Sequence, residues 1–344
     1  MDTKRDILEY LHYHPQASRN DITKGLQLPE SEATVKRMIA AMVADGDIVV
    51  EGQGRSTRYG LSPKAQLLLP YNIDTYFAIE ADQRQVQTTF NFDLIKNTLP
   101  SVELFTTEEM AQLNELQALY RNNISGLSPQ AYQKEIERLG IDLSWKSSQI
   151  EGNTYSLLET ERLLREKLTA NGKSREEATM LLNHKAALDF VIANPEFMHT
   201  LTVRGIDELH SLLVQELSVQ RGIRSHRVGI TGTNYRPLDN EFQIREALDD
   251  TCRLINSRTN VFEKSLLALI LLSYIQAFED GNKRTARIVS NAILIAHGYC
   301  PLSFRTVDSI DYKKAMLIFY EQNSLHAFKQ LFIGQYEFAV KEYF

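Results

Sequence analysis

The sequence is poor in cysteine and tryptophan, and both shortages narrow the class of protein. It has two cysteines, Cys252 and Cys300, and one tryptophan in 344 residues. Two cysteines this far apart form neither a disulfide framework nor the close pairs of thiolates that bind zinc. We therefore expect reduced thiols and no cysteine-held metal, which is typical of a cytoplasmic protein.

Long apolar runs and a large excess of one charge are also missing. The most apolar stretch, residues 266–275, is too short to span a bilayer, and no apolar leader follows Met1. A formal net charge of −6 and a pI near 5.8 argue against a surface that coats nucleic acid or membrane, although they leave room for a local basic face. The length of the chain predicts two or three domains. Its composition predicts a cytoplasmic protein.

Residues 1–65 form a separate predicted unit. Apolar residues recur at helical spacing in three stretches, and two β-rich stretches around a turn at 52–54 follow them. Three helices and a hairpin resemble a winged helix-turn-helix, an α+β fold that implies duplex DNA as a partner, with the third helix in the major groove and the wing on the backbone. The candidate DNA contacts are Lys36 and Arg37 on the helix and Arg55 and Arg58 on the wing.

The charge of this unit leaves a second interpretation open. Basic and acidic residues nearly balance within it, so DNA affinity would be modest unless dimerisation doubles it. Winged helices also serve as protein-docking or homodimer modules, and the sequence does not choose between the two uses.

The remainder of the chain has helical patterns. Residues 66–105 carry Pro70, Pro100 and several aromatic side chains, a composition too apolar for a free linker, so we expect this segment to pack across the second domain. Helical patterns dominate residues 106–344, and residues 265–272 are apolar on every side. That stretch predicts a buried central helix.

Residues 276–287 hold the densest group of chemically active side chains. The turn at 280–282 lies between an apolar run and a helical pattern, so it can aim the first free N–H groups of the next helix at an anion. Arg284 and Arg287 are three residues apart and share a helix face, where both guanidinium groups can bind phosphate oxygens. The carboxylate of Asp280 could hold a magnesium ion on the same phosphates.

This segment resembles the signature loop of the Fic family, His-Pro-Phe-x-Asp/Glu-Gly-Asn-Gly-Arg-x-x-Arg. The resemblance implies an all-α fold that transfers AMP from ATP to a hydroxyl group of a protein, with Mg²⁺ as the metal and the histidine as general base. It implies that Phe278 anchors the loop in the core and that Asp280 binds the metal. The catalytic positions become Gln276, Asn282 and Arg284, and the positions for the ATP phosphates become Gly281, Asn282, Lys283, Arg284 and Arg287.

Two positions depart from the family pattern. Gln276 stands at the histidine position, and its amide can hydrogen-bond a hydroxyl group but cannot accept the proton, a function that contributes about 10²–10⁴-fold in rate. We therefore expect weak or absent AMP transfer, unless a neighbour such as His226 acts as a substitute base. Lys283 replaces a small residue, and Asn-Lys-Arg at this point also occurs in the related Doc toxins, which phosphorylate their target.

Residues 147–153 resemble the inhibitory motif of the family, Ser/Thr-x-x-x-Glu-Gly/Asn, at the end of a helix over about 129–151. The resemblance implies that Glu151 pairs with Arg287 and turns the γ-phosphate of ATP away from a productive pose. A carboxylate that faces a phosphate site also repels the nucleotide. Taken alone, the same residues are those of a helix C-cap ended by glycine. The candidate inhibitory residues are Ser147, Glu151 and Gly152.

Residues 224–238 predict a short β-hairpin, because Val228 and Ile230 alternate with small residues before a turn rich in glycine, asparagine and proline. The hairpin resembles the Fic flap, which pairs with the backbone of the target as an added strand. The candidate docking residues are Val228, Ile230 and Tyr235. A plain surface hairpin is the alternative interpretation.

Two hypotheses of different class follow from these patterns. The first is a cytoplasmic Fic-fold protein that binds Mg²⁺ and ATP at residues 276–287, is inhibited by Glu151, and is built to transfer AMP to an unidentified target protein. The second is a non-catalytic transcriptional regulator in which ATP occupancy shifts the DNA-binding or homodimer state of the winged helix. Lys283 adds a variant of the first, phosphoryl transfer of the Doc kind.

Overall fold

The computed structural model describes residues 3–27 and 31–344, and the chain divides into two compact units. The N-terminal unit contains residues up to Ala78 together with 322–327, and the core unit contains residues 79–321 and 328–344. Residues 66–78, the first part of the predicted connecting segment, thus cluster with the N-terminal unit. Residues 322–327 belong there too, and the Leu325 N–H donates to the Leu67 carbonyl at 2.8 Å.

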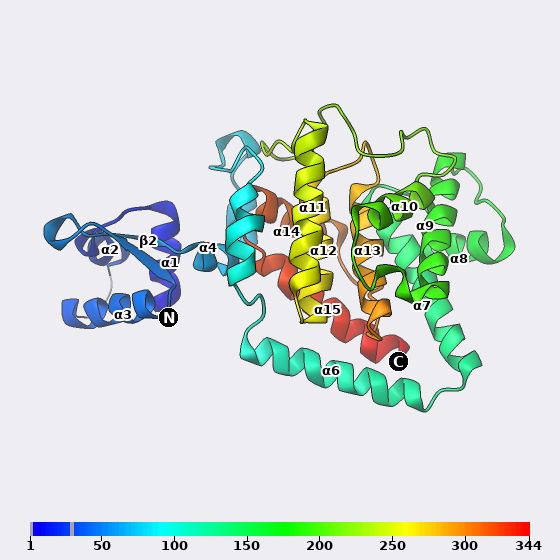
Figure 1. Ribbon diagram of the computed structural model, residues 1–344, viewed down its shortest axis with the longest axis horizontal. Coiled ribbons are helices and arrows are strands. Elements are labelled where there is room, and N and C mark those ends of the chain that lie inside the picture. The colour runs from blue at the N-terminus through cyan, green and yellow to red at the C-terminus, as the bar shows by residue number, and fades with distance from the viewer. Residues whose placement is uncertain (1–2, 28–30) are drawn as a thin grey trace. The chain divides into compact units, whose positions relative to one another are not determined.

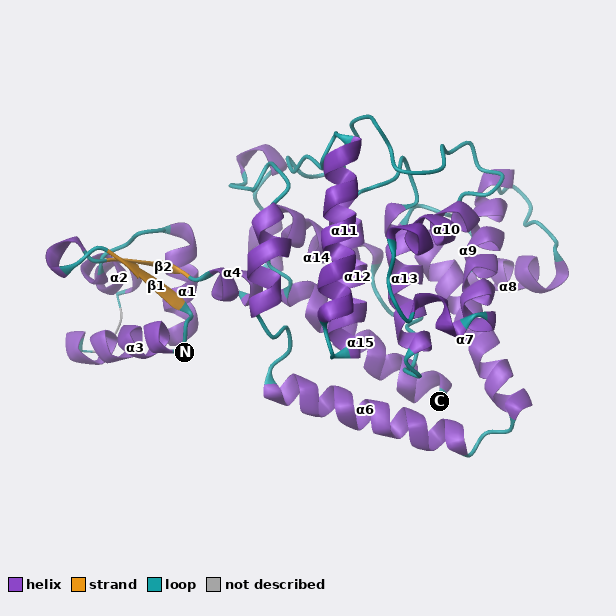
Figure 2. Ribbon diagram, viewed as in Figure 1, coloured by secondary structure: helices purple, strands orange, loops and turns teal. Residues whose placement is uncertain are grey.

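The N-terminal unit contains the three helices and the hairpin that the apolar pattern predicts (Figure 2). Its core is made of Ile7, Leu11, Ile22, Val35 and Ile39 with a few neighbours, which are the inward positions of the helices. The two strands pair antiparallel. The elements are α1 (Thr3–Tyr13), α2 (Arg19–Leu26), α3 (Glu32–Ala44), β1 (Ile48–Glu51), η1 (Gly54–Ser56), β2 (Arg58–Leu61), α4 (Pro63–Leu68) and α5 (Ile73–Phe77).

Serine caps fix where two of these helices begin. The Ser18 hydroxyl accepts from the Asp21 N–H, and the Ser31 hydroxyl accepts from the Thr34 N–H. Each bond satisfies one of the N–H groups that a helix start leaves without a partner. Serine is among the residue types preferred at such helix starts.

The core unit is helical throughout its described elements (Figure 1). Its short helical turns are η2 (Ala81–Gln83), η3 (Leu94–Thr98), η4 (Leu99–Ser101) and η5 (Pro195–Met198). Its longer helices are α6 (Thr107–Ser125), α7 (Pro129–Ile150), α8 (Leu157–Glu166), α9 (Arg175–Ala193), α10 (Val203–Leu213), α11 (Glu241–Ser257), α12 (Val261–Ile275), α13 (Asn282–Ala296), α14 (Ser309–Gln322) and α15 (His326–Tyr343).

Helix α12 is the buried centre of this unit. Leu266 through Leu271 are all fully buried, because the helix is apolar on every side and can lower its free energy only by packing on all faces. Helix α13 packs along it, and α11 covers another side. The turn between α12 and α13, which carries the candidate site, is therefore mounted on the most buried part of the molecule.

Residues 224–238 do not form the predicted hairpin. Apart from one isolated bridge between Arg236 and Thr89, no strand is assigned to this segment. Its polar groups bind other parts of the chain instead: the Arg236 N–H donates to the Thr88 carbonyl at 2.9 Å, and the Asn234 amide donates to the Ala81 carbonyl at 3.2 Å. The alternating pattern that predicted two paired strands therefore belongs to a single extended loop.

In the described part of the chain, no helix combines the length and the apolar character that crossing a membrane requires.

Candidate functional site

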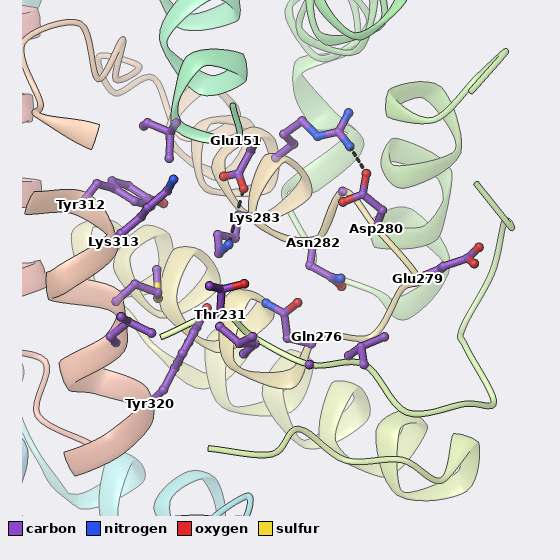
Figure 3. Close-up of a pocket in the computed structure, with 18 residues that line it drawn as sticks. Glu151, Thr231, Gln276, Glu279, Asp280, Asn282, Lys283, Tyr312, Lys313 and Tyr320 are labelled. Atoms are coloured by element: carbon purple, nitrogen blue, oxygen red, sulfur yellow. Dashed lines mark hydrogen bonds and ion pairs between the residues drawn. The ribbon is translucent and has the colours of Figure 1, made fainter. Parts of the chain in front are cut away.

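A cleft of about 400 Å³ lies over the start of α13, entirely within the core unit. One wall is the loop from Gln276 to Arg284, and the opposite wall is residues 228–231 (Figure 3). The end of α7 contributes Glu151, and α14 closes the remaining side. The cleft thus brings together three segments that the sequence singled out separately.

The loop is closed by one asparagine side chain. The Asn282 carbonyl oxygen accepts from the Phe278 N–H at 2.8 Å, and its amide nitrogen donates to the Phe278 carbonyl at 2.8 Å. Gly281 has φ +79°, a left-handed conformation that costs glycine little and other residues more. Phe278 is buried, as predicted. Both polar atoms of the Asn282 side chain are thus bonded inside the loop, and the residue also borders the cleft.

His210 supports this loop from α10, and no sequence pattern pointed to it. Its Nε2–H donates to the Asp280 carbonyl at 3.0 Å, and its ring stacks on Phe278 with centroids 3.7 Å apart. Burial lowers the pKa of His210, so the neutral ring is favoured. The contact joins residues 70 positions apart, which no local pattern reports.

Arg284 is buried beneath the cleft with part of its hydrogen-bonding capacity unused. Its side chain is 1% exposed, and its Nη2 donates to the Asp280 carboxylate at 2.7 Å. Among the described residues, its Nε and Nη1 have no hydrogen-bond partner. Burial lowers the pKa of Arg284, although Asp280 and Glu151 oppose that effect. Unused donors on a buried cation at a helix N-terminus are the arrangement that an anionic ligand satisfies.

Arg287 lies one turn further along α13 and is held by the end of α7. It is fully buried, its Nε donates to the Ser147 hydroxyl at 2.8 Å, and its Nη2 donates to the Glu151 carboxylate at 2.7 Å. Another Nη2 bond reaches the Ser147 carbonyl at 2.9 Å. The pairing of Glu151 with Arg287 is the contact that the sequence motif implied.

Glu151 faces a second cation as well. Its other oxygen lies 3.5 Å from the Lys283 Nζ, and its side chain is 19% exposed (Figure 3). Burial alone would raise the pKa of Glu151, but the charges of Arg287 and Lys283 outweigh it and hold that pKa below its ordinary value. Gly152, with φ +100°, ends the helix just behind it. Glu151 is thus both the C-cap residue of α7 and a carboxylate that borders the cleft.

Gln276 caps α12 and borders the cleft. It has φ 52° and ψ 56°, and its side-chain nitrogen donates to the Ser273 carbonyl at 2.6 Å. Among the described residues, no histidine lines the cleft. His226 is exposed and outside the cleft lining, so the structure gives no support to it as a substitute base.

The opposite wall is fixed by Arg224. Its Nε donates to the Gln276 carbonyl at 2.7 Å, and its two terminal nitrogens donate to the carbonyls of His226 and Leu238. Val228 and Ile230 border the cleft, as predicted. Tyr235 does not: its side chain is 2% exposed and buried in the core, so its assignment as a docking residue is corrected.

Tyr235 serves as an anchor instead. Its hydroxyl donates to the Tyr274 carbonyl at 3.0 Å, and its ring stacks on the Tyr274 ring with centroids 4.8 Å apart. A tyrosine in a loop was taken for a contact residue because neither burial nor a stacking partner is visible in the local pattern.

The donor set fits a magnesium ion carried by phosphates better than a metal held by protein alone. Among the described residues, no group of three or more histidine, cysteine, aspartate or glutamate side chains could hold a metal. The Asp280 carboxylate borders the cleft and is 63% exposed. Mg²⁺ commonly binds one or two carboxylates and completes its six positions with substrate phosphates and water. Asp280 would supply the protein ligand of such an ion.

Helix α14 adds side chains to the cleft that the sequence did not single out. Tyr312, Lys313, Met316, Leu317 and Tyr320 all border it. The Tyr320 hydroxyl donates to the Ser273 carbonyl at 2.8 Å, which fixes that side of the wall. These side chains of α14 combine one cation, Lys313, with apolar surface. Many helices have such a pattern, so the sequence did not mark these residues as part of a site.

The candidate DNA contacts of the N-terminal unit lie where the sequence placed them. Lys36 and Arg37 are exposed on α3, and Arg55 is exposed in the turn of the hairpin. Arg58 is half-buried on β2, and its guanidinium donates to the Thr57 carbonyl.

Residues 200–294 match the family model described as Fic/DOC family. The chain is 26% identical over 221 residues to the protein adenylyltransferase Fic of Nematostella vectensis, an alignment that covers 63% of this chain and 51% of that protein. It is 29% identical over 161 residues to protein adenylyltransferase fic-1 of Caenorhabditis briggsae, which covers 44% of this chain and 31% of that one. The chain thus spans about half of the first of these curated relatives and a little under a third of the second.

Solved structures show the same fold at lower identity. A fragment of Fic-1 from C. elegans superposes with a TM-score of 0.61 at 21% identity, covering 69% of this chain and 72% of that chain. A Fic family protein from Desulfovibrio desulfuricans G20 gives 0.57 at 20% identity, covering 70% and 75%. The predicted all-helical Fic fold is confirmed, and the chain carries a domain of the Fic/DOC family.

Proposed function

We propose that the core unit binds ATP with Mg²⁺ and is built to transfer AMP to a hydroxyl group of a target protein. The observation that carries this proposal is the pair of buried arginines at the start of α13, both with donors that no described residue satisfies. A buried donor without an acceptor is costly even on a cation that is otherwise paired, and a polyphosphate would supply the missing acceptors. The names of the curated relatives support the same reaction.

Each part of the cleft has a role in that reaction. The first N–H groups of α13 and the donors of Arg284 would hold the phosphates, because a helix start leaves its first N–H groups without partners in the helix and Arg284 has unused donors beside them. Mg²⁺ held by Asp280 would neutralise phosphate charge. Gln276 borders the cleft and can hydrogen-bond the attacking hydroxyl group. Without a base at that position, only alignment and electrostatics remain to accelerate transfer.

The opposite wall has the features of a docking edge for the target. Among the described residues, the backbone of 228–231 makes no backbone hydrogen bond, and Val228 and Ile230 face the cleft lining. An extended peptide segment could pair with these free groups and place its hydroxyl side chain over the loop.

Glu151 is proposed to inhibit the site. It occupies Arg287 and borders the cleft, so it both withdraws a phosphate ligand and adds a negative charge. Two cations hold it there, Arg287 and Lys283. Release of Glu151 would free both for the terminal phosphates.

The test uses Glu151→Gly, Gln276→His and the double variant, incubated with Mg²⁺ and ATP. We expect Glu151→Gly to bind ATP more tightly, and the double variant to gain an AMP-sized mass on itself or on proteins of a lysate. Gln276→Asn is the matched control, since it keeps an amide and adds no base. ATP labelled at the α- or the γ-phosphate separates AMP transfer from the Doc-like phosphoryl transfer that Lys283 suggests.

Two results would contradict the proposal. Absence of nucleotide binding in Glu151→Gly would remove the phosphate site. Nucleotide binding without transfer in the double variant would leave the rival hypothesis, a nucleotide-sensing regulator that has lost the reaction.

The exposed cations on α3 favour a second proposal, that the N-terminal unit binds duplex DNA. Lys36, Arg37 and Arg55 are all exposed, and phosphate contacts by such side chains make binding weaken steeply as salt rises. Fluorescence anisotropy with duplex DNA at two salt concentrations tests it, with Lys36→Gln and Arg37→Gln together as the variant. Unchanged binding in that variant would point to a docking or homodimer role instead. A DNA-binding role requires a cytoplasmic protein, and two buried cysteines without a disulfide are compatible with that location.

A further inference from the structure

His210 makes two different contacts with the phosphate loop, and none of the motifs includes it. Its ring lies flat on Phe278, with an angle of 5° between the planes. Its Nε2–H donates to the carbonyl of Asp280 at 3.0 Å. The side chain has no exposed surface. The residue therefore belongs to the floor beneath the loop and not to the cleft itself.

The contact falls at a carbonyl that the other side chains of the loop do not bind. The side chain of Asn282 ties the two ends of the turn together, Arg284 holds the Asp280 carboxylate, and Thr285 holds the Gly281 carbonyl. Among the described residues, the Asp280 carbonyl accepts its hydrogen bond from His210. A Cβ at Gly281 would lie 3.6 Å from the His210 ring, so the ring also packs directly against that glycine.

The hydrogen bond determines which nitrogen carries the proton. A carbonyl can only accept, so Nε2 is the protonated nitrogen of the neutral ring. Among the described residues, Nδ1 has no partner, and a lone pair left there costs less than a buried N–H would. The ring is therefore set up to donate in one direction only, at Asp280.

We propose that His210 is a positioning residue for the phosphate loop, whose Nε2–H fixes the Asp280 peptide so that the Asp280 carboxylate and the first N–H groups of α13 face the cleft. This inference rests on the proposed function only for the identity of the ligand. The hydrogen bond from His210 restrains the loop in the free protein as well. Loss of this restraint would leave the fold intact and make the loop open more often.

Three variants separate the two contacts. His210→Phe keeps a ring to stack on Phe278 and loses the donor. His210→Gln loses the ring but can place an amide nitrogen where Nε2 lies, whereas His210→Asn is one bond shorter and cannot. Amide hydrogen exchange of residues 279–284 is measured in the free proteins, and ATP binding with and without Mg²⁺ is measured in the Glu151→Gly background.

We expect loop exchange to be about 5–30-fold faster in His210→Phe and His210→Asn, and close to wild type in His210→Gln, since one hydrogen bond has that effect on an opening equilibrium. ATP affinity should also fall in His210→Phe, and fall more in Mg²⁺ than without it, because the loop then occupies its binding conformation for a smaller fraction of the time. Unchanged loop exchange in His210→Phe, or equal acceleration in all three variants, would overturn the inference. Failure of the Glu151→Gly parent to bind ATP would instead refute the proposed function and leave the exchange result to decide the role of His210.

Discussion

The two walls of the cleft are held by different kinds of side chain. The loop at 276–287 is closed by a short amide, because Asn282 bonds both backbone polar groups of Phe278. The segment at 224–238 is closed by a long cation, because Arg224 donates to the carbonyls of His226 and Leu238, and the same side chain ties the segment to the Gln276 carbonyl.

This difference suits the two ligands that the walls are proposed to meet. Phosphate has one shape and few ways to bind, so a preformed cradle loses little entropy on binding. A protein target varies in its side chains but always offers a backbone, and a wall with free backbone groups between firm attachments can pair with it. The comparison makes testable statements about both walls.

Removal of Arg224 should have the largest effect. Arg224→Met leaves three carbonyl groups without their donor, and two of them lie at the ends of one segment. We expect the free energy of unfolding to fall by about 3–5 kcal/mol, because hydrogen bonds from charged groups are strong and their loss leaves acceptors unsatisfied. Urea denaturation measures it.

Arg227→Met is the matched control for that prediction. Arg227 lies three residues away in the same wall, is 85% exposed, and pairs with Asp239 at the surface. An exposed pair contributes little to stability, about 0–1 kcal/mol. Equal losses in the two variants would mean that the wall does not depend on its buried attachment.

Replacement of Glu151 should have an intermediate effect, with a dependence on pH. The pKa of Glu151 is lowered in the folded protein, so its ion pairs stabilise the fold above its ordinary pKa of 4.5 and lose that contribution as pH falls through the lowered value. Glu151→Gln should therefore lose stability at pH 7, lose less on acidification than wild type, and bind ATP about 10-fold more tightly, a difference of about 1.4 kcal/mol.

Thermal melting from pH 7 to pH 3 and calorimetric titration with ATP measure the two parts of this prediction. Glu161→Gln, which removes an exposed pair with Arg165 on α8, is the control. Parallel pH profiles for wild type and Glu151→Gln would show that the ion pairs of Glu151 do not stabilise the folded state.

The smallest effect is expected at Tyr235. Tyr235→Phe keeps the ring on Tyr274 and loses only the bond from its hydroxyl to the Tyr274 carbonyl. Stability should fall by about 1 kcal/mol with ATP affinity unchanged. An altered ATP affinity would mean that the anchors of this wall also shape the phosphate loop.

Local patterns predicted the parts of the site that depend on neighbours in sequence. The turn before α13 and the cap at Gly152 each rest on residues within a few positions of one another. The resemblance of residues 147–153 to an inhibitory motif added the pairing of Glu151 with Arg287, which local reasoning alone could not place.

The missed features all depend on distant contacts. His210 and Tyr235 reach their partners across 70 and 39 residues, and hydropathy patterns carry no information on such pairs. The hairpin was wrong for a related reason, since alternation of apolar and small residues predicts an extended backbone without saying what the backbone pairs with. The bonds between Asn282 and Phe278 are local, four residues apart, but they depend on the exact loop geometry, which hydropathy patterns do not report either.

The two buried arginines also make the melting temperature of the protein a probe for its ligand. A folded state that contains cations with unused donors is less stable than it would be with those donors occupied. Any anion that fits should therefore raise the melting temperature, and a ligand at one hundred times its dissociation constant adds about 2.7 kcal/mol. A screen of nucleotides by melting temperature would rank them without a substrate protein, and the most stabilising one would name the donor of the transferred group.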